Sequence, residues 1–357
     1  MRSVRNIAVR RVSNINSRFY LLRTKEILKM TAEIRKRTVD VIKGIAIIFV
    51  LITHFEWTAE QRQIVVFPFF INMAIPVFMI ITGYVYSLSL QRLGIQHLEE
   101  AYRWRLIAKR LIRYTLPVII VVIWELCSPA FHISGTCLDL MRWILSGTYG
   151  KGSYYYPVMV QVAFLFPIIY FILDIKKEIG LLICFFVNLL YELLAWAYTM
   201  NTDCFRFLAF RYVFVLAAGV YTFKQYKLCP FLSALMMAGG GAFIAAITYL
   251  GYETKILNAS WATTNVISSL WIVPLTIWIL REKKMRFLPL EIIGRASYHI
   301  FLVQMVYYRG YYTLLSDKVS TWQMHFLLGV LISLAIGIVF YYIEKPLQDQ
   351  ISRKLLK

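Results

Sequence analysis

Apolar stretches of about twenty residues recur along almost the whole chain. An α-helix rises 1.5 Å per residue, so about twenty apolar residues span the roughly 30 Å hydrocarbon core of a bilayer. Ten such stretches can be read from the sequence, at residues 39–57, 64–90, 109–128, 154–174, 179–199, 205–223, 230–250, 261–280, 288–312 and 322–343. Because the connections between them are short, we predict one all-α bundle of about ten transmembrane helices, a multi-pass membrane protein.

The balance of charge supports this class of protein and indicates an orientation. Only 16% of the residues are charged, whereas soluble domains carry roughly 25%. A net charge of +20 suggests nucleic-acid binding in a soluble protein, but cytoplasmic loops of membrane proteins also accumulate Lys and Arg. With the N-terminus in the cytoplasm, 29 of the 39 Lys and Arg residues fall on the inner side and 7 on the outer side. We therefore predict that both chain ends are cytoplasmic, with the lipid bilayer and not nucleic acid as a partner.

The same pattern divides the chain into three segments. Residues 1–37 hold 11 Lys and Arg and are expected to form a basic cytoplasmic arm; Met30 is an alternative start, which leaves the status of residues 1–29 open. Residues 38–346 form the predicted membrane domain, and residues 347–357 a short basic cytoplasmic tail. The five cysteines show neither CxxC spacing nor a Cys/His cluster, so no metal site is expected.

Charged side chains inside the first span need a reason, because an ionised group at the bilayer centre costs about 2.5–3.5 kcal/mol. This span contains Asp40, Lys43 and His54. Lys43 and His54 are eleven residues apart, which places them on one helix face and about 16 Å apart along the axis. Asp40 is close enough in sequence to pair with Lys43. His54 then lies in the outer half of the bilayer, where a neutral imidazole suits a general base acting on a hydroxyl; the alternative is a structural histidine at the outer interface.

A pair of arginines opens the third span. Arg110 and Arg113 are three residues apart, so they lie on one face of the helix near the cytoplasmic interface. Two guanidinium groups together suit phosphate oxygens, which they bind bidentately. The alternative is that both residues are the positive flank of a membrane span.

Further polar residues lie inside later spans. They are Gln161, Asn188, Glu192, Arg211, Arg295, His299 and Gln304. Arg295 and His299 are four residues apart and share a helix face. Hydrogen bonding between helices accounts for amides in such positions, while Glu192 and Arg295 are explained either by ion pairs inside the bundle or by catalysis.

Several short motifs, taken in order, make the chain from Arg37 to Pro346 resemble the bacterial acyltransferase-3 family of membrane enzymes. The matching pieces are Arg37-x-x-Asp40-x-x-Lys43 ending in His54, Ile75 to Tyr84, Arg110 to Pro117, Tyr154 to Pro157 with Gln161, Ile293 to Leu302, and Glu344 to Pro346. Each piece is short, and it is their order across the spans that carries the resemblance. Lys43, Met159 and Gln304 depart from residues common in that family.

The resemblance implies a bacterial plasma-membrane enzyme that takes an acetyl-type group from cytoplasmic acyl-coenzyme A. It implies that acetyl-coenzyme A is the donor and that the acceptor is a hydroxyl of an extracytoplasmic sugar or glycopolymer. The family's first-span histidine corresponds to His54, expected to act with Lys43 and Asp40, and the donor phosphates to Arg110 and Arg113. Residues expected to contact substrate are Tyr155, Gln161, Glu192, Arg295 and His299.

Two other classes of function remain open. A polysaccharide or glycolipid transporter would also need charged residues inside its spans, and broken helices in inverted repeats would favour it; the glycines at 239–241 are the one interruption seen in the sequence. The third hypothesis is a membrane protein that binds or senses a ligand without turnover. The sequence does not name the acceptor, and it leaves a homo-oligomer open.

Overall fold

The computed structural model describes residues 37–54, 57–128, 136–147, 152–175, 177–251, 264–312, 319 and 321–355. The predicted basic arm, except for Arg37, and the alternative start at Met30 lie outside them. The described part of the chain is built from helices and contains no β-strand. The expectation of an all-α protein is therefore confirmed.

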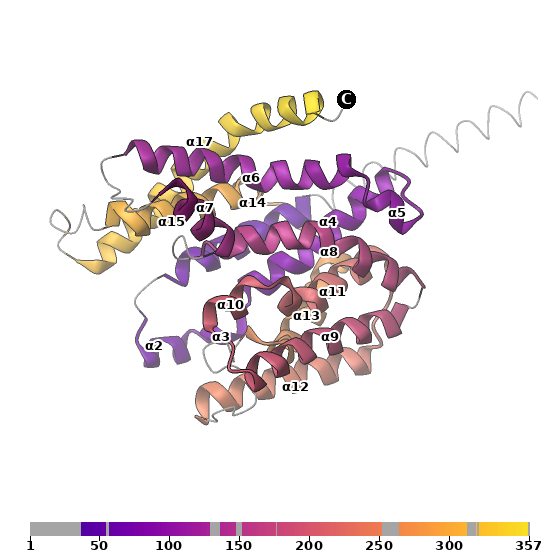
Figure 1. Ribbon diagram of the computed structural model, residues 1–357. Coiled ribbons are helices and arrows are strands. Elements are labelled where there is room, and N and C mark those ends of the chain that lie inside the picture. The colour runs from indigo at the N-terminus through magenta and orange to yellow at the C-terminus, as the bar shows by residue number, and fades with distance from the viewer. Residues whose placement is uncertain are drawn as a thin grey trace, which may run out of the picture.

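The helices pack side by side in one bundle (Figure 1). A first helix covers residues 37–52. The others are α2 (Ala59–Ile64), α3 (Phe67–Phe70), α4 (Ala74–Arg92), α5 (Leu98–Ala101), α6 (Trp104–Cys127), α7 (Cys137–Ser146), α8 (Tyr155–Ile175), α9 (Lys177–Ala197), α10 (Thr202–Phe207), η1 (Ala209–Tyr212), α11 (Val213–Phe223), α12 (Pro230–Tyr249), α13 (Val266–Glu282), α14 (Leu288–Arg295), α15 (Ser297–Val306), η3 (Tyr307–Tyr311) and α17 (Trp322–Leu355).

Helical structure is present at each of the ten expected spans. Within the described residues, five helical stretches are long and apolar enough to cross a membrane, judged by length and composition: Phe67–Arg92, Tyr155–Ile175, Lys177–Ala197, Pro230–Tyr249 and Trp322–Lys354. Large apolar side chains such as Ile123, Leu190 and Leu331 are more than half exposed on the outer faces of their helices, as lipid-facing positions require. The count of ten spans and the cytoplasmic location of the ends stay predictions.

The ninth expected span differs most from a simple helix. Residues 288–312 are divided into α14, α15 and the π-helical turn η3. Pro289 lies in the first turn of α14, where its missing N–H is tolerated. A π-helical turn is wider than an α-helical turn and is often found at functional sites, so η3 is a candidate location for functional side chains.

The seventh span, by contrast, is one continuous helix. The glycines at 239–241 do not interrupt α12, so the sequence-based interpretation of a break was wrong. Gly240 instead lets α12 approach α13, because a Cβ added there would clash with the backbone of Trp271. Close helix approach at small residues is a common packing mode in membranes.

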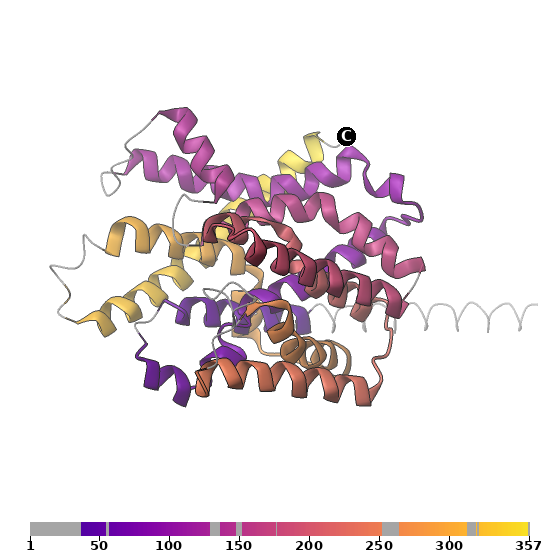
Figure 2. The same ribbon diagram turned by 60° about the horizontal axis from the view of Figure 1, so that its bottom comes forward.

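The last helix is the longest. α17 has 34 residues, which corresponds to about 51 Å and exceeds the thickness of a hydrocarbon core. It continues through Pro346 and includes most of the expected basic tail, in which Asp349 pairs with Lys345 of the preceding turn at 2.6 Å. Figure 2 shows α17 crossing the bundle beside α15.

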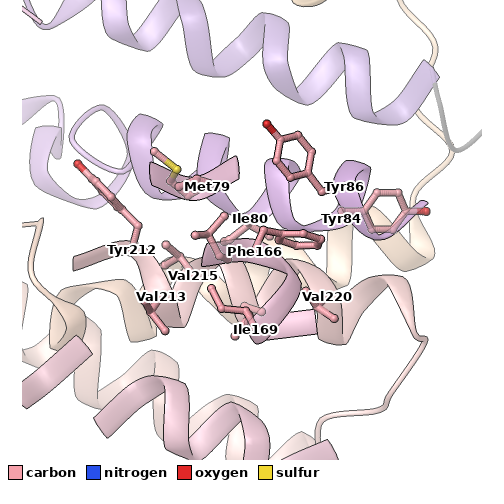
Figure 3. Packing of buried hydrophobic residues seen from close by; sticks show 14 of the residues in the cluster. Met79, Ile80, Tyr84, Tyr86, Phe166, Ile169, Tyr212, Val213, Val215 and Val220 are labelled. Carbon is pink, nitrogen blue, oxygen red and sulfur yellow. The ribbon is translucent and has the colours of Figure 1, made fainter. Parts of the chain in front are cut away.

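The centre of the bundle is the contact between α4 and α11. Gly83 and Gly219 face each other's helix so closely that a Cβ on either would clash with a backbone carbonyl oxygen. Figure 3 shows Ile80, Phe166 and Ile169 packed around this contact, and all three are almost completely buried. This rigid centre supports the helices that line the site described next.

Candidate functional site

A cavity of about 1030 Å³ lies between the first helix, α4, α6, α15 and α17. Its volume is at the upper end of the roughly 300–1,000 Å³ typical of ligand sites. Side chains from the start and the end of the chain meet here, including Lys43, Arg110, Arg113, Arg295 and His299. The structure therefore brings together most of the residues that were selected from the sequence.

The cavity wall is strongly cationic. Eight basic residues line it, against two aspartates, Asp40 and Asp349. The basic residues are Lys43, Arg92, Arg105, Lys109, Arg110, Arg113, Arg295 and Lys345. Such an excess of positive charge in a low-dielectric cleft attracts an anionic ligand.

Asp40 is the centre of an ion-pair network on this wall. Its carboxylate lies 2.8 Å from Lys43 Nζ and 3.4 Å from Arg295 Nε. Arg295 also reaches Glu291 at 3.4 Å. The pairing of Asp40 with Lys43 follows from their spacing, but the contact with Arg295 depends on the packing of Gly294 against the Asp40 backbone.

Arg110 and Arg113 occupy the adjoining wall. The Arg110 guanidinium lies 4.5 Å from the centre of the Tyr86 ring and donates to the Ala163 carbonyl at 3.4 Å. Arg113 lies 6.0 Å from the Tyr114 ring. Aromatic contacts hold the planar guanidinium groups without neutralising them, so both remain available to an anion.

His54 lies beyond the cavity rather than in its wall. Val50, one helical turn before His54, is the last residue of the first helix that lines the cavity. The His54 ring stacks on Tyr308 of η3, with ring centres 5.0 Å apart. His54 thus lies in the turn just past the end of the helix that carries Lys43, not on the shared helix face that was expected, and the apolar stretch containing Ile47 and Val50 separates the two residues.

Tyr155 and His299 are both part of the cavity wall. The Tyr155 ring lies 5.5 Å from Phe301, which places it beside α15. His299 Nε2 lies 3.1 Å from Glu344 Oε2, and both side chains are buried. The sequence did not reveal this histidine–carboxylate pair, because its members are 45 residues apart on different helices.

Gln161 and Glu192, also selected as substrate contacts, lie outside this group. Gln161 bonds the Phe207 carbonyl at 2.8 Å and the Ala209 amide at 3.1 Å, and so bridges α10 and η1. Glu192 accepts from the Val266 amide at 2.9 Å, at the start of α13. Helix ends leave backbone groups without partners, and these two polar side chains supply them.

The cavity mouth includes residues that sequence reasoning assigned only to membrane topology. Arg92, Arg105, Lys109 and Lys345 line it, although their positions at span ends had indicated only the positive-inside pattern. A second ion pair, also missed, joins Arg309 of η3 to buried Glu125 of α6 at 3.2 Å. Their distance in sequence gave no signal for the contact.

These features define a class: a membrane protein whose helices enclose a large cationic cavity with a buried histidine in its wall. The family model of the acyltransferase domain matches residues 37–342. The chain belongs to the acyltransferase-3 family and is a membrane acyltransferase. No curated protein and no solved structure gives a significant match.

Proposed function

We propose that this acyltransferase takes an acetyl-type group from cytoplasmic acyl-coenzyme A and transfers it to a hydroxyl of a sugar or glycopolymer on the outer side of a bacterial plasma membrane. One observation carries the proposal, namely that the polarity of the cavity changes from one end to the other. The first helix contributes Asp40 and Lys43 and then Ile47 and Val50. A ligand with a charged head and a less polar arm matches this gradient.

A second helix repeats the gradient, and a third adds to its cationic end. α4 contributes Arg92 near its C-terminal end and Ile75 and Phe78 near its N-terminal end. α6 contributes Arg105 and Arg113 to the same cavity. Acyl-coenzyme A carries its phosphates at the nucleotide end and its thioester at the end of a long arm, so the cationic mouth suits the nucleotide and the apolar end the thioester.

On this proposal, Arg110 and Arg113 bind the donor phosphates, since paired guanidinium groups match phosphate oxygens. His54 acts as the base that takes the proton from the acceptor hydroxyl, or relays the acyl group. Lys43, held by Asp40, lines the cationic part of the cavity on the first helix, about three turns before His54. Tyr155, Arg295 and His299 contact the substrate from the cavity wall, whereas Gln161 and Glu192 support the bundle.

Binding of the donor can be tested without knowledge of the acceptor. A ligand that binds only the folded protein raises its unfolding temperature. We expect acetyl-coenzyme A and coenzyme A to stabilise the protein in lipid nanodiscs, and acetyl-pantetheine, which lacks the phosphates, to have no effect at the same concentration. The double variant Arg110→Gln/Arg113→Gln should lose the effect. Lys227→Gln, an exposed cation outside the cavity, should keep it.

Turnover is tested by release of coenzyme A thiol from acetyl-coenzyme A, with and without a crude glycan fraction from the source membranes. We expect glycan-stimulated release that disappears in a folded His54→Ala variant. Stimulated release that survives in His54→Ala would remove His54 from the mechanism. If acetyl-coenzyme A neither stabilises the protein nor loses its acyl group, the proposal fails and polysaccharide or glycolipid export becomes the better assignment.

A further inference from the structure

The contact between α15 and α17 contains buried polar atoms that lack partners. Among the described residues, the side chains of His299, Gln304, His325, Ser333 and Glu344 each have at least one N or O atom without a hydrogen bond. All five side chains are more than nine-tenths buried. A buried polar atom without a partner is costly, and ordered water is its usual partner in native proteins. We call these five residues the polar seam.

Glycine contacts show how the seam is ordered along the two helices. A Cβ on Gly337 would lie 2.5 Å from the Ile300 backbone, and one on Gly329 would lie 2.6 Å from the Tyr307 ring. The helices therefore run in opposite directions, with residue 337 level with 300 and residue 329 close to 307. By interpolation, Gln304 and Ser333 lie at the same level, about 7 Å along α15 from His299.

One end of the seam opens at the cavity. His299 lines the cavity wall, and its Nε2 is held by Glu344 at 3.1 Å. Its Nδ1 and the second carboxylate oxygen of Glu344 are among the atoms without partners. A histidine held by a carboxylate can accept and release protons, so this end is equipped to exchange a proton with a ligand in the cavity.

The other end of the seam reaches His54 through a series of ring contacts. The His325 ring lies 4.7 Å from Tyr312, Tyr312 lies 5.7 Å from Tyr308, and Tyr308 lies 5.0 Å from His54. The π-helical turn η3 is the segment that carries Tyr308 toward the first helix. The seam and these rings thus connect His54 with the cavity. This connection is separate from the first helix, on which the apolar side chains of Ile47 and Val50 lie between His54 and Lys43.

The reaction has a use for such a route, on the basis of the proposed function. Transfer breaks the C–S bond of the thioester and forms a C–O bond to the acceptor. The hydroxyl loses a proton, and the departing thiolate takes up one proton to become the thiol. If the hydroxyl is deprotonated at His54 while sulfur leaves inside the cavity, the proton has to cross the distance between them.

We propose that the polar seam is a hydrated path that carries this proton from the region of His54 to His299, which hands it to the departing thiolate. Gln304 and Ser333 hold water in the middle of the path, and His325 and His299 stand at its two ends. Within the seam, Glu344 positions His299 and does not itself carry the proton. The proton balance is closed within the reaction, and the path needs no further reactant.

Hydration of the seam can be measured without any turnover. Radiolytic hydroxyl-radical labelling oxidises side chains beside bound water even when they are buried. In protein reconstituted in liposomes, we expect His325 and Tyr307 to be oxidised faster than Met79, which is fully buried in the core and belongs to a chemically more reactive residue type. Oxidation of His325 and Tyr307 slower than that of Met79 would overturn the proposal.

Use of the path is tested with Gln304→Leu/Ser333→Ala, which removes both polar groups at the middle level. We expect glycan-stimulated thiol release to fall at least tenfold while the affinity for acetyl-coenzyme A changes less than twofold. Ser333→Thr keeps a hydroxyl and should keep most of the activity. Ser87→Ala is the matched control, because that buried hydroxyl is bonded to the Gly83 carbonyl at 2.7 Å.

The outcomes separate this inference from the proposed function. Full turnover in Gln304→Leu/Ser333→Ala, even with a hydrated seam, would show that no proton uses the path. A fall in turnover accompanied by an equal loss of acetyl-coenzyme A affinity would indicate damage to the cavity and would also overturn the inference. If the wild-type protein transfers no acyl group, the proposed function fails, and the proton path fails with it whatever the labelling shows about water.

Discussion

Two helix pairs of this bundle are built from similar residues, yet they differ in how their polar groups are treated. In the α4–α11 pair, Gly83 and Gly219 bring the backbones together. The buried hydroxyls of Ser87, Thr82 and Thr222 all donate to a carbonyl of their own helix, at 2.7–2.8 Å. Every one of these polar groups serves the local fold.

The α15–α17 pair also has two glycines at its contact, Gly329 and Gly337. Its buried hydroxyl, amide and imidazole groups nevertheless contain atoms that no described residue satisfies. Sequences that fold well seldom leave such groups, and the exceptions concentrate at functional sites. The comparison teaches that the α4–α11 pair supports the structure, whereas the α15–α17 pair buries polar atoms that the local fold does not satisfy, which is why we propose a chemical role for it.

The largest expected effect comes from a substitution that disrupts the α4–α11 pair. In Gly219→Val, the new side chain would collide with the Ile80 carbonyl of α4, and neither backbone can move away without displacing the core. We expect no folded, monodisperse protein after extraction in mild detergent, measured by fluorescence-detected gel filtration. Gly239→Ala is the control, because nothing lies within 4 Å of its added Cβ; it should stabilise the helix by about 0.5–1 kcal/mol.

The next effect concerns the ion pair that joins η3, the turn that follows α15, to α6. Arg309→Met removes a partner of the buried Glu125 carboxylate. Losing one member of a buried ion pair destabilises a protein by about 3–5 kcal/mol, and we expect a large drop in unfolding temperature. The double variant Glu125→Gln/Arg309→Met should recover much of the loss. Equal unfolding temperatures for the single and double variants would show that the pair is not the cause.

A smaller effect, on rate alone, is expected from Glu344→Gln. Glutamine keeps the shape of the side chain and can still hydrogen-bond His299, but it replaces the carboxylate that positions the imidazole with a neutral amide. We expect turnover to fall about tenfold, which corresponds to about 1.4 kcal/mol in the barrier. Binding of acetyl-coenzyme A, followed by thermal shift, should stay within twofold. Unchanged turnover would assign the pair to packing.

The smallest effect is also the most direct comparison of the two helix pairs. Ser87→Ala removes a hydroxyl that makes a hydrogen bond, and the loss should cost about 0.5–1.5 kcal/mol of stability with turnover intact. Ser333→Ala removes a hydroxyl without a protein partner. We expect it to change stability by less than about 0.5 kcal/mol and to slow turnover. Stability is measured by chemical denaturation and turnover by thiol release, on both variants. A larger loss of stability in Ser333→Ala than in Ser87→Ala would contradict the comparison.

Sequence reasoning predicted the parts of this molecule that depend on local pattern. Apolar runs located the helices, and the spacing of Asp40 and Lys43 predicted their ion pair, because both follow from helix geometry alone. Arg110 and Arg113 were selected from their local motif, and they line the cavity. Their role as ligands of phosphate remains a proposal.

Contacts between distant segments could not be predicted in the same way. The pairs His299–Glu344 and Arg309–Glu125 join residues 45 and 184 positions apart, and no periodic pattern connects them. Gln161 was expected at the substrate, but its amide bridges the backbone where α10 gives way to η1. A buried polar residue looks the same in a sequence whether it serves a ligand or a helix end.

The length of α17 has a consequence for how this protein can change over time. A single uninterrupted rod carries Ser333 in the seam, Glu344 beside the cavity and Ser352 at the cavity mouth. One inserted residue would rotate everything beyond it by about 100° and turn one of these groups away from its place. Single substitutions along α17 leave the spacing of these groups unchanged. An insertion or deletion between positions 333 and 352 does not, so we expect the number of residues in this part of the helix to stay constant. Variation in length among descendants of this chain should therefore collect in the connections between helices and avoid α17.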